Sequence, residues 1–390
     1  MSQLLNERWS ETKEALLEGL QGNRRASMAV CLENTRRSLT ESATAGATSA
    51  GNVATLNRVI LPVIRRVMPT VIANEIVGVQ PMTGPVGQIH TLRVRYADSS
   101  TEVNAGEEAL SPFKIASAYS GNDASPAKAA VTSVLEGQPG KRMSIQILKS
   151  PVEAKSRKLS ARWTFEAAQD AQAQQGIDIE AEIMAALAQE ITAEIDQEIL
   201  GSLRNLAVVE ETYDQSLVSG TATFVGDEHA ALAIQINRVS NLIAQRTRRG
   251  AGNWAVVSNQ ALTILQSATT SAFARTTEGT FEAPTNTKFV GTLNGAMRIY
   301  VDAYKSDTDD NNQVLVGYKG ASEADAAAFY CPYIPLMSSG VVLDPATFEP
   351  VVGFLTRYGY VELSNSASSL GNAADYLGKV AITSANVSYK

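Results

Sequence analysis

The segment Ile177–Leu206 constrains the fold most, because it carries the longest helical pattern in the chain. An apolar residue recurs at every fourth position of this segment, at Ile179, Ile183, Leu187, Ile191, Ile195, Ile199 and Leu203. At about 100° per residue, each step of four residues advances this apolar seam by about 40° around the helix axis. Along a helix of roughly 45 Å the seam winds around the axis, so we expect the two ends to meet different neighbours.

Acidic side chains fall largely between the seam positions of this helix. They are Glu180, Glu182, Glu190, Glu194, Asp196 and Glu198. Two carboxylates at a fixed spacing can perform acid–base catalysis, but no histidine accompanies them here. We therefore expect a solvated face of the helix rather than an active site.

The segment Arg58–Tyr96 combines a helix, a connection and a strand. Its first apolar run is limited by Pro69, because proline lacks an N–H group and clashes with the preceding turn. A second apolar run, Val71–Val79, is followed by the sequence PMTGPVG, which predicts a turn. Apolar and polar residues then alternate over Thr91–Tyr96, which predicts a half-solvated strand.

A long polar excursion, residues 97–142, separates this strand from a returning strand over Met143–Leu148. The excursion has few large apolar residues, so we expect it to form no core of its own. An isolated hairpin is only marginally stable in water. These features predict an arm that reaches away from the body and is covered by a partner, with a disordered insertion as the alternative.

The order of features in Arg58–Tyr96, above all the sequence IVGVQPMTGPVGQ, resembles the major capsid proteins of T-even-type tailed bacteriophages. A second block, Phe329–Tyr358, reads FYCPYIPLMSSGVVLDPATFEPVVGFLTRY and resembles the same family. The resemblance implies an α+β chain with the HK97-like capsid fold.

That fold would divide the chain into five segments. They are an N-terminal arm with the first connection (1–84), an extended two-stranded loop (85–150), a peripheral domain with a spine helix (151–223), an axial α/β domain (224–328), and a return to the peripheral domain (329–390). The extended loop would lie over a neighbouring subunit.

The resemblance also implies a structural function. The chain would self-assemble into hexameric, and in some heads pentameric, capsomers of a bacteriophage head that encloses double-stranded DNA without sequence-specific binding. Scaffold, portal, vertex and decoration proteins would be its further partners. It would be assembled in the host cytoplasm and reside in the virion. A vertex paralogue that forms only pentamers and an encapsulin-like compartment shell remain alternatives.

The N-terminal region predicts an amphipathic helix over Met1–Gly22, a second helix over Ala26–Arg37 and a small-residue linker over Ser42–Gly51. In the resembled family this region is often removed by a protease that cuts after Glu in an Ile/Leu-x-Glu context. Three glutamates fit that context, at Glu7, Glu18 and Glu41. Glu41 is best placed because it adjoins the linker. Such tripeptides are common in helices rich in Leu and Glu, so an uncut arm is the alternative.

Composition narrows the remaining function classes. A chain of 390 residues exceeds what one core usually supports, so we expect at least two lobes. The net charge of −7 argues against nonspecific binding of nucleic acid, which depends on Lys and Arg. Cys31 and Cys331 are too few for a disulfide framework or zinc site, and predict two free thiols. No apolar run approaches the roughly 18–20 residues of a membrane span.

From about Phe224 the pattern becomes α/β. A helix opens at Asp227 and buries one apolar face, made of Leu232, Ile236, Val239 and Ile243. It ends at arginines followed by Gly250, as the helix dipole and C-cap preferences favour. Further elements are a strand over Trp254–Val257, a short helix capped by Asn259, a hairpin around Asn294-Gly295, and strands over Gln313–Tyr318, Val351–Tyr360 and Lys379–Tyr389. We expect the last two strands to join the sheet beneath the spine helix.

Candidate catalytic and ligand sites are weak. The loop Asp307–Asn311 resembles a calcium loop but lacks the central Gly and the closing Glu. Gly137–Lys141 is no P-loop, because its glycines are too close together. Neither His90 nor His229 accompanies a nucleophile motif. We therefore predict no enzyme activity, cofactor or metal. The arginines that follow Ile243 would serve helix capping or subunit contact, with DNA contact as the alternative.

Overall fold

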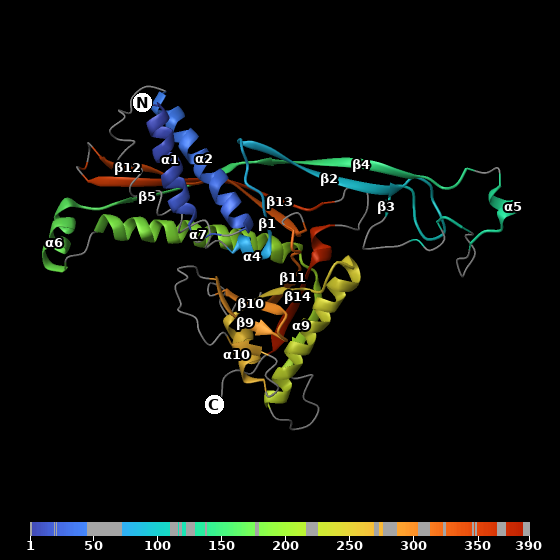
Figure 1. The fold of residues 1–390 in the computed structure, drawn as a ribbon. Coiled ribbons are helices and arrows are strands. Elements are labelled where there is room, and N and C mark those ends of the chain that lie inside the picture. Colours follow the sequence, from blue (N-terminus) through green and yellow to red (C-terminus); the bar gives the residue numbers. More distant parts are fainter. Residues whose placement is uncertain are drawn as a thin grey trace.

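The computed structural model describes residues 2–18, 20, 22–44, 72–109, 116, 119–121, 129–136, 139–175, 179–215, 225–268, 273–275, 287–302, 313–322, 325–344, 347, 349–364 and 372–384. The predicted helix that ends at Pro69 and the acidic loop Asp307–Asn311 lie outside these residues. A long helix, α7, runs through the middle of the molecule, with one sheet above it, another below it, and a long hairpin that projects to one side (Figure 1).

The upper sheet has four strands in the order β1-β12-β13-β5. Their bounds are Gly78–Val79, Ala328–Leu343, Pro350–Glu362 and Lys155–Arg162. β1 pairs with β12 in parallel, and the other pairs are antiparallel. On β13, Phe354 and Tyr358 are buried in the same core cluster as α7, while Leu355 and Arg357, which point to the other face, are partly exposed. The predicted strand Val351–Tyr360 is thus confirmed.

The spine helix α7 spans Ile179–Leu206 and buries a straighter stripe than the seam predicts. Ile191, Ile195, Ile199 and Leu203 are buried as expected, but near the start Met184 and Ala188 are buried instead of Ile183 and Leu187. Residue 184 lies about 20° from residue 191 around the axis, and residue 183 about 80°. α7 contacts both β5 and β14. α6 (Phe165–Gln175) precedes it in the chain.

The lower sheet has seven strands in the order β6-β14-β11-β7-β10-β9-β8. Their bounds are Val209–Asp214, Leu377–Ser384, Gln313–Gly317, Trp254–Val257, Met297–Asp302, Thr287–Leu293 and Phe273–Arg275. β7 alternates between the two faces: Trp254 and Val256 belong to the cluster of α7, whereas Ala255 and Val257 pack with α9 and α10. This sheet therefore carries helices on both faces.

α9 (Val225–Thr247) and α10 (Asn259–Ser267) cover the second face of the lower sheet. The four apolar residues predicted for α9 are all 0% exposed. Two capping predictions were wrong. Arg248, not Gly250, has the positive φ of 50° after α9. Gly250 is needed for space, because a Cβ there would lie 2.6 Å from Cε2 of Tyr318. The oxygen that caps α10 belongs to Ser258, not Asn259.

The last two predicted strands lie in different sheets, although we expected them to share one. β14 lies between β6 and β11 in the seven-stranded sheet, not in the four-stranded sheet that carries β13. Val380 is 0% exposed there and packs in the cluster of α9. The turn η1 (Ala373–Tyr376) leads into it. The last part of the chain is therefore shared between the two sheets.

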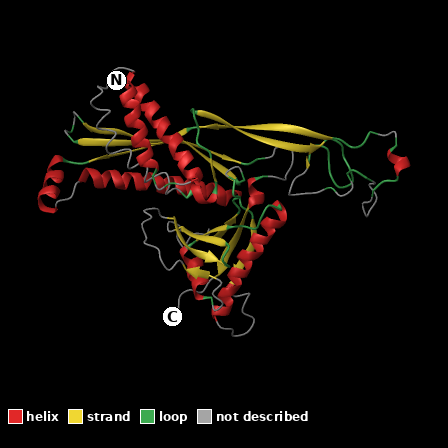
Figure 2. Ribbon diagram, viewed as in Figure 1, coloured by secondary structure: helices red, strands yellow, loops and turns green. Residues whose placement is uncertain are grey.

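Two N-terminal helices, α1 (Ser2–Leu17) and α2 (Gly22–Thr44), form an antiparallel pair across the upper sheet (Figures 1 and 2). α2 is longer than predicted, since residues 42–44 continue the helix instead of starting the linker. A single helical turn, α4 (Ala73–Ile76), leads into β1. The N-terminal region therefore reaches the four-stranded sheet at two places.

Candidate functional site

The projecting hairpin is the clearest candidate for a functional surface. β2 (Val86–Tyr96) pairs antiparallel with β4 (Met143–Glu153), from Val86 opposite Glu153 to Tyr96 opposite Met143. The two strands leave the body together and extend well beyond it (Figure 2). The predicted two-stranded arm is confirmed, and both strands are longer than their alternating segments indicated.

One face of this arm is apolar and largely uncovered. Met143, Ile145 and Ile147 alternate along β4, so they point to the same face. Their exposed fractions are 49%, 71% and 60%. Val94 lies opposite Ile145 in the register, on the same face, and is itself partly buried against a small cluster around Tyr96. We call the residues Met143, Ile145 and Ile147 the arm stripe. Contiguous exposed apolar surface of this kind marks an interaction site.

The tip of the arm is more ordered than the sequence predicts. Tyr96, Val103, Ala109 and Tyr119 form a small buried cluster, in which the rings of Tyr96 and Tyr119 lie 4.4 Å apart. Two further elements lie near the tip, β3 (Glu108–Ala109) and α5 (Thr132–Leu135). The expectation that the excursion forms no core was therefore wrong, because Tyr119 from the middle of the excursion packs against Tyr96, which directly precedes it.

A polar contact closes the same loop. The backbone N–H of Arg142 donates to Asp98 Oδ2 at 2.8 Å. This bond, together with the Arg142 side chain, lowers the pKa of Asp98 below its ordinary value. The hydroxyl of Tyr119 donates to the carbonyl of Arg142. The start and the end of the excursion are thus fastened to each other.

The root of the arm is packed tightly against the upper sheet. Met82, Val152, Phe329 and Cys331 form a buried cluster there. A Cβ on Gly359 would lie 2.3 Å from Cγ1 of Val152, so only glycine fits beneath β4 at this position. The arm is thus a rigid extension of the sheet at its root, while its outer half contributes the exposed stripe.

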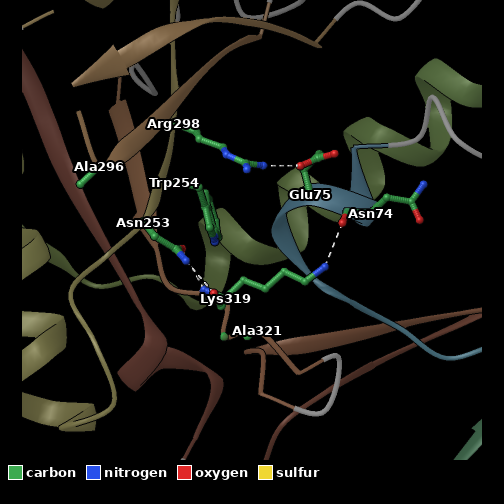
Figure 3. Close-up of a pocket in the computed structure, with 9 residues that line it drawn as sticks. Asn74, Glu75, Asn253, Trp254, Ala296, Arg298, Lys319 and Ala321 are labelled. Atoms are coloured by element: carbon green, nitrogen blue, oxygen red, sulfur yellow. Dashed lines mark hydrogen bonds and ion pairs between the residues drawn. The ribbon is translucent and has the colours of Figure 1, made fainter. Parts of the chain in front are cut away.

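A polar junction ties α4 to the lower sheet (Figure 3). Arg298 Nη1 lies 3.0 Å from Glu75 Oε2, and the hydroxyl of Tyr300 donates to the same oxygen at 3.3 Å. Lys319 Nζ donates to the carbonyl of Asn74 at 2.8 Å. A cleft of about 490 Å³ opens between these groups. Arg298 and Glu75 bind each other and Lys319 binds a backbone carbonyl, so these contacts hold α4 against the lower sheet.

Asp196 is the exception to the solvated acidic face predicted for α7. Its side chain is 2% exposed, and its Oδ1 accepts the backbone N–H of Ile72 at 2.9 Å. Oδ2 accepts no hydrogen bond from the residues that the structure describes. Burial raises its pKa to about 7, the Ile72 N–H opposes this rise, and the charge of Asp302 adds to it. Sequence periodicity could not show that a carboxylate at this position would accept a hydrogen bond from the backbone N–H of a distant residue.

Three further acids on or beside α7 form ion pairs. Arg157 Nη1 lies 2.8 Å from Glu194, and its Nη2 pairs with Glu198. Asp302 is 0% exposed and lies 2.7 Å from Arg204 Nη2. These contacts link β5 and β10 to the spine helix. These ion pairs could not be predicted from the sequence, because each joins residues that are far apart along the chain.

The sequence-predicted sites do not converge on a catalytic centre. Glu41 lies in the last turn of α2, and the structure does not describe its side chain. His90 is exposed on β2, whereas His229 is 1% exposed on α9. Cys31 and Cys331 are buried free thiols, as predicted. In the part of the chain that the structure describes, no three His, Cys, Asp or Glu residues gather into a metal site.

Two arginines at the end of α9 bind acids of the same chain. Arg246 Nη1 lies 2.8 Å from Glu210, and Arg249 Nη1 lies 2.6 Å from Asp325. These pairs favour the structural interpretation of the arginines over DNA contact. Among the described helices, none is long and apolar enough to cross a bilayer.

Comparison with known proteins agrees with this architecture. The family model described as "Major capsid protein Gp23" matches residues 53–139 and 125–382. The major capsid protein of Vibrio phage KVP40 is 29% identical, over 84% of this chain and 80% of that protein. The major capsid protein of Enterobacteria phage T6 is 30% identical, over 81% and 79%. For Enterobacteria phage T4 the identity is 29%, over 81% and 76%.

Among solved structures, one titled "Mycobacterium phage Bobi" is similar at a TM-score of 0.49 and 14% identity, and covers 81% of this chain and 91% of that one. The α+β fold implied by the resemblance has its main parts here: a spine helix beneath a sheet, an extended two-stranded arm and a second α/β sheet. The family match spans most of the chain, and its named members are structural proteins of phage heads rather than enzymes. The chain therefore belongs to the Gp23 family of major capsid proteins of tailed bacteriophages.

Proposed function

We propose that the chain assembles with copies of itself into ring-shaped hexamers, and that pentamers of the same chain or of a vertex relative complete a closed head around double-stranded DNA. The observation that carries this proposal is the arm stripe, whose three side chains are between 49% and 71% exposed. Burying one such side chain typically contributes about 1.5–3 kcal/mol. A second copy would supply that burial.

The geometry of the arm supports a head-to-tail contact. The arm projects from one side of the body. When it lies on the body of a neighbouring copy, the two surfaces in contact, arm and body, are different. Contacts of this kind close into rings when the rotation between copies is right. Binding that stabilises only the assembled form also couples folding of the arm to assembly. We therefore place the arm of each copy over the body of the next.

We assign the body around α7 and the four-stranded sheet to the peripheral domain, and the seven-stranded sheet to the axial domain near the capsomer axis. β6 and β14 then connect the two domains. β6 follows α7 and β14 follows β13 along the chain, and both strands pair within the seven-stranded sheet. Scaffold, portal, vertex and decoration proteins would be further partners. The net charge of −7 suits a container that does not adhere to its DNA.

The assembly proposal is tested by placing a charge on the arm stripe. Ile145→Asp should leave a folded, unassembled subunit, because a buried unpaired carboxylate strongly opposes the contact between copies. Gln146→Asp is the matched control, since residue 146 lies on the opposite face of the same strand. Electron microscopy and sedimentation of both proteins report shell formation.

Closed shells of Ile145→Asp that match the parent would refute the role of the arm stripe. For the parent chain, shells with capsomers of six copies support the proposal. Isolated five-fold caps would indicate a vertex protein, and shells loaded with a protein guest would indicate a compartment.

We further propose that maturation cuts the chain after Glu41. Its support is the sequence Leu39-Thr-Glu41 and its place in the last turn of α2, next to a small-residue stretch. Mass spectrometry of the N-terminus of particles tests this. The mature chain should begin at Ser42, Glu41→Gln should retain residues 1–41, and Glu18→Gln should be cut as the parent is. A mature chain that begins at Met1 would contradict the proposal.

A further inference from the structure

The two N-terminal helices pack onto the body through one continuous buried face. α2 lies along β12, and its Met28, Cys31 and Leu32 are at most 1% exposed. These three side chains belong to the main core cluster together with Ile76 of α4 and Tyr330 of β12. The helices are therefore part of the core, although α1 and α2 stand outside the sheets in Figure 1.

Polar contacts fix how α2 sits on this surface. Asn34 Nδ2 donates to the carbonyl of Met82 at 2.7 Å and to that of Tyr333 at 3.0 Å. Arg24 forms an ion pair with Glu75 of α4. Asn34 is 6% exposed, so its two hydrogen bonds are made away from water. Such bonds orient the helix and select one register along β12.

The two helices also hold each other. Trp9 Nε1 donates to Glu33 Oε2 at 3.1 Å, and the guanidinium of Arg36 lies 5.5 Å from the centre of the Trp9 ring. Leu16 and Leu17 at the end of α1 are buried in the same core cluster as α2. Residues 2–44 thus form a helical pair with its own internal contacts and one docking face.

We propose that the surface formed by β12, β1 and α4 is a docking groove for an amphipathic helix. Residues 2–44 occupy this groove as a ligand. They stay bound when the chain is cut between Glu41 and Ile72. A cut there breaks none of the contacts described above, because each joins residues on opposite sides of the cut or within the helical pair. Cleavage of the chain and departure of residues 2–44 from the groove are then two separate events. The inference goes beyond the proposed assembly and does not depend on where maturation cuts the chain.

The reactivity of the two cysteine thiols shows whether the helical pair is docked. Cys31 is 0% exposed inside the groove, and burial raises its pKa to about 12. Cys331 is 2% exposed in the separate cluster at the root of the arm. Thiol alkylation needs an accessible thiolate. Departure of the helical pair would make Cys31 reactive and leave Cys331 protected.

The test uses the full chain with a recognition sequence for a specific protease inserted between residues 45 and 50. After complete cutting, gel filtration shows whether the fragment elutes with the body, and iodoacetamide labelling with peptide mass mapping follows both cysteines. We expect co-elution and unchanged Cys31 labelling. A separate fragment with Cys31 labelled more than about tenfold faster would overturn the proposal. Rapid labelling of both cysteines would overturn it too, because the body would then have lost its structure.

Variants locate the docking face. After cutting, Asn34→Ala should release the fragment faster than the parent, and Leu32→Asp should release it at once. Arg25→Ala, on the exposed side of α2, is the matched control and should change nothing. If Leu32→Asp does not fold, which Cys331 labelling of the uncut chain shows, Asn34→Ala decides the question alone. Retention equal to that of the parent in Asn34→Ala would contradict the assigned groove.

Discussion

Replacing Asp196 with asparagine should change how stability depends on pH. The folded state raises the pKa of Asp196 from 3.8 to about 7 because the carboxylate is buried. A carboxyl group with a raised pKa binds its proton more tightly in the folded than in the unfolded chain. Its stabilising effect is therefore complete below about pH 4, is lost as pH rises towards 7, and does not change further above that.

The size of this effect follows from the shift. Three pKa units correspond to about 4 kcal/mol of unfolding free energy between pH 4 and pH 8. Asp196→Asn removes the charge and keeps an oxygen that can accept the Ile72 N–H. The new amide donors cost about 1–3 kcal/mol if they find no acceptor. The variant should thus be more stable than the parent at pH 8 by about 1–3 kcal/mol, and no more stable at pH 4.

Urea unfolding of the unassembled subunit at pH 4, 6 and 8 measures this difference directly. Hydrogen exchange of the Ile72 amide adds a local readout, because that amide donates to Asp196. Glu190→Gln, on the exposed side of α7, is the matched control and should shift no midpoint. An Asp196→Asn variant that is destabilised at pH 8 and keeps the pH dependence of the parent would refute the reasoning.

Two further substitutions test the packing. Leu203→Ala should lower the unfolding free energy by about 2–5 kcal/mol, whereas Ile183→Ala should cost well under half as much, because Leu203 is fully buried and Ile183 is partly exposed. Equal losses in urea unfolding would favour the wound seam over the straight stripe. Gly359→Ala should cost about 1–3 kcal/mol and loosen the root of the arm, because its Cβ would overlap Val152; unchanged hydrogen exchange over β4 would contradict that close contact.

Local patterns predicted most of the elements. The period of α9 identified all four of its buried apolar residues, because a helix with one covered face must repeat about every 3.6 residues. Alternation likewise identified β2 and β4, and the hairpin turn at Asn294 and Gly295 has the positive φ angles that such turns require. In each case the information lies within a few neighbouring residues.

Contacts between distant segments were not predictable in the same way. The burial of Asp196 depends on Ile72, which lies 124 residues away and donates its backbone N–H to the carboxylate. The place of β14 was mispredicted because an alternating strand fits either sheet, and its neighbours β6 and β11 decide which. The small core at the arm tip depends on Tyr119 meeting Tyr96 across the excursion. Local periodicity contains none of this information.

The central claim is that a lone chain leaves the arm stripe uncovered and that a second copy covers it in the shell. An electron cryo-microscopy map of assembled particles, at a resolution that shows side chains, tests this most directly. The account predicts that Met143, Ile145 and Ile147 pack against a neighbouring copy and lose most of their exposure. A shell in which these three side chains face solvent, or fold back onto their own subunit, would contradict it.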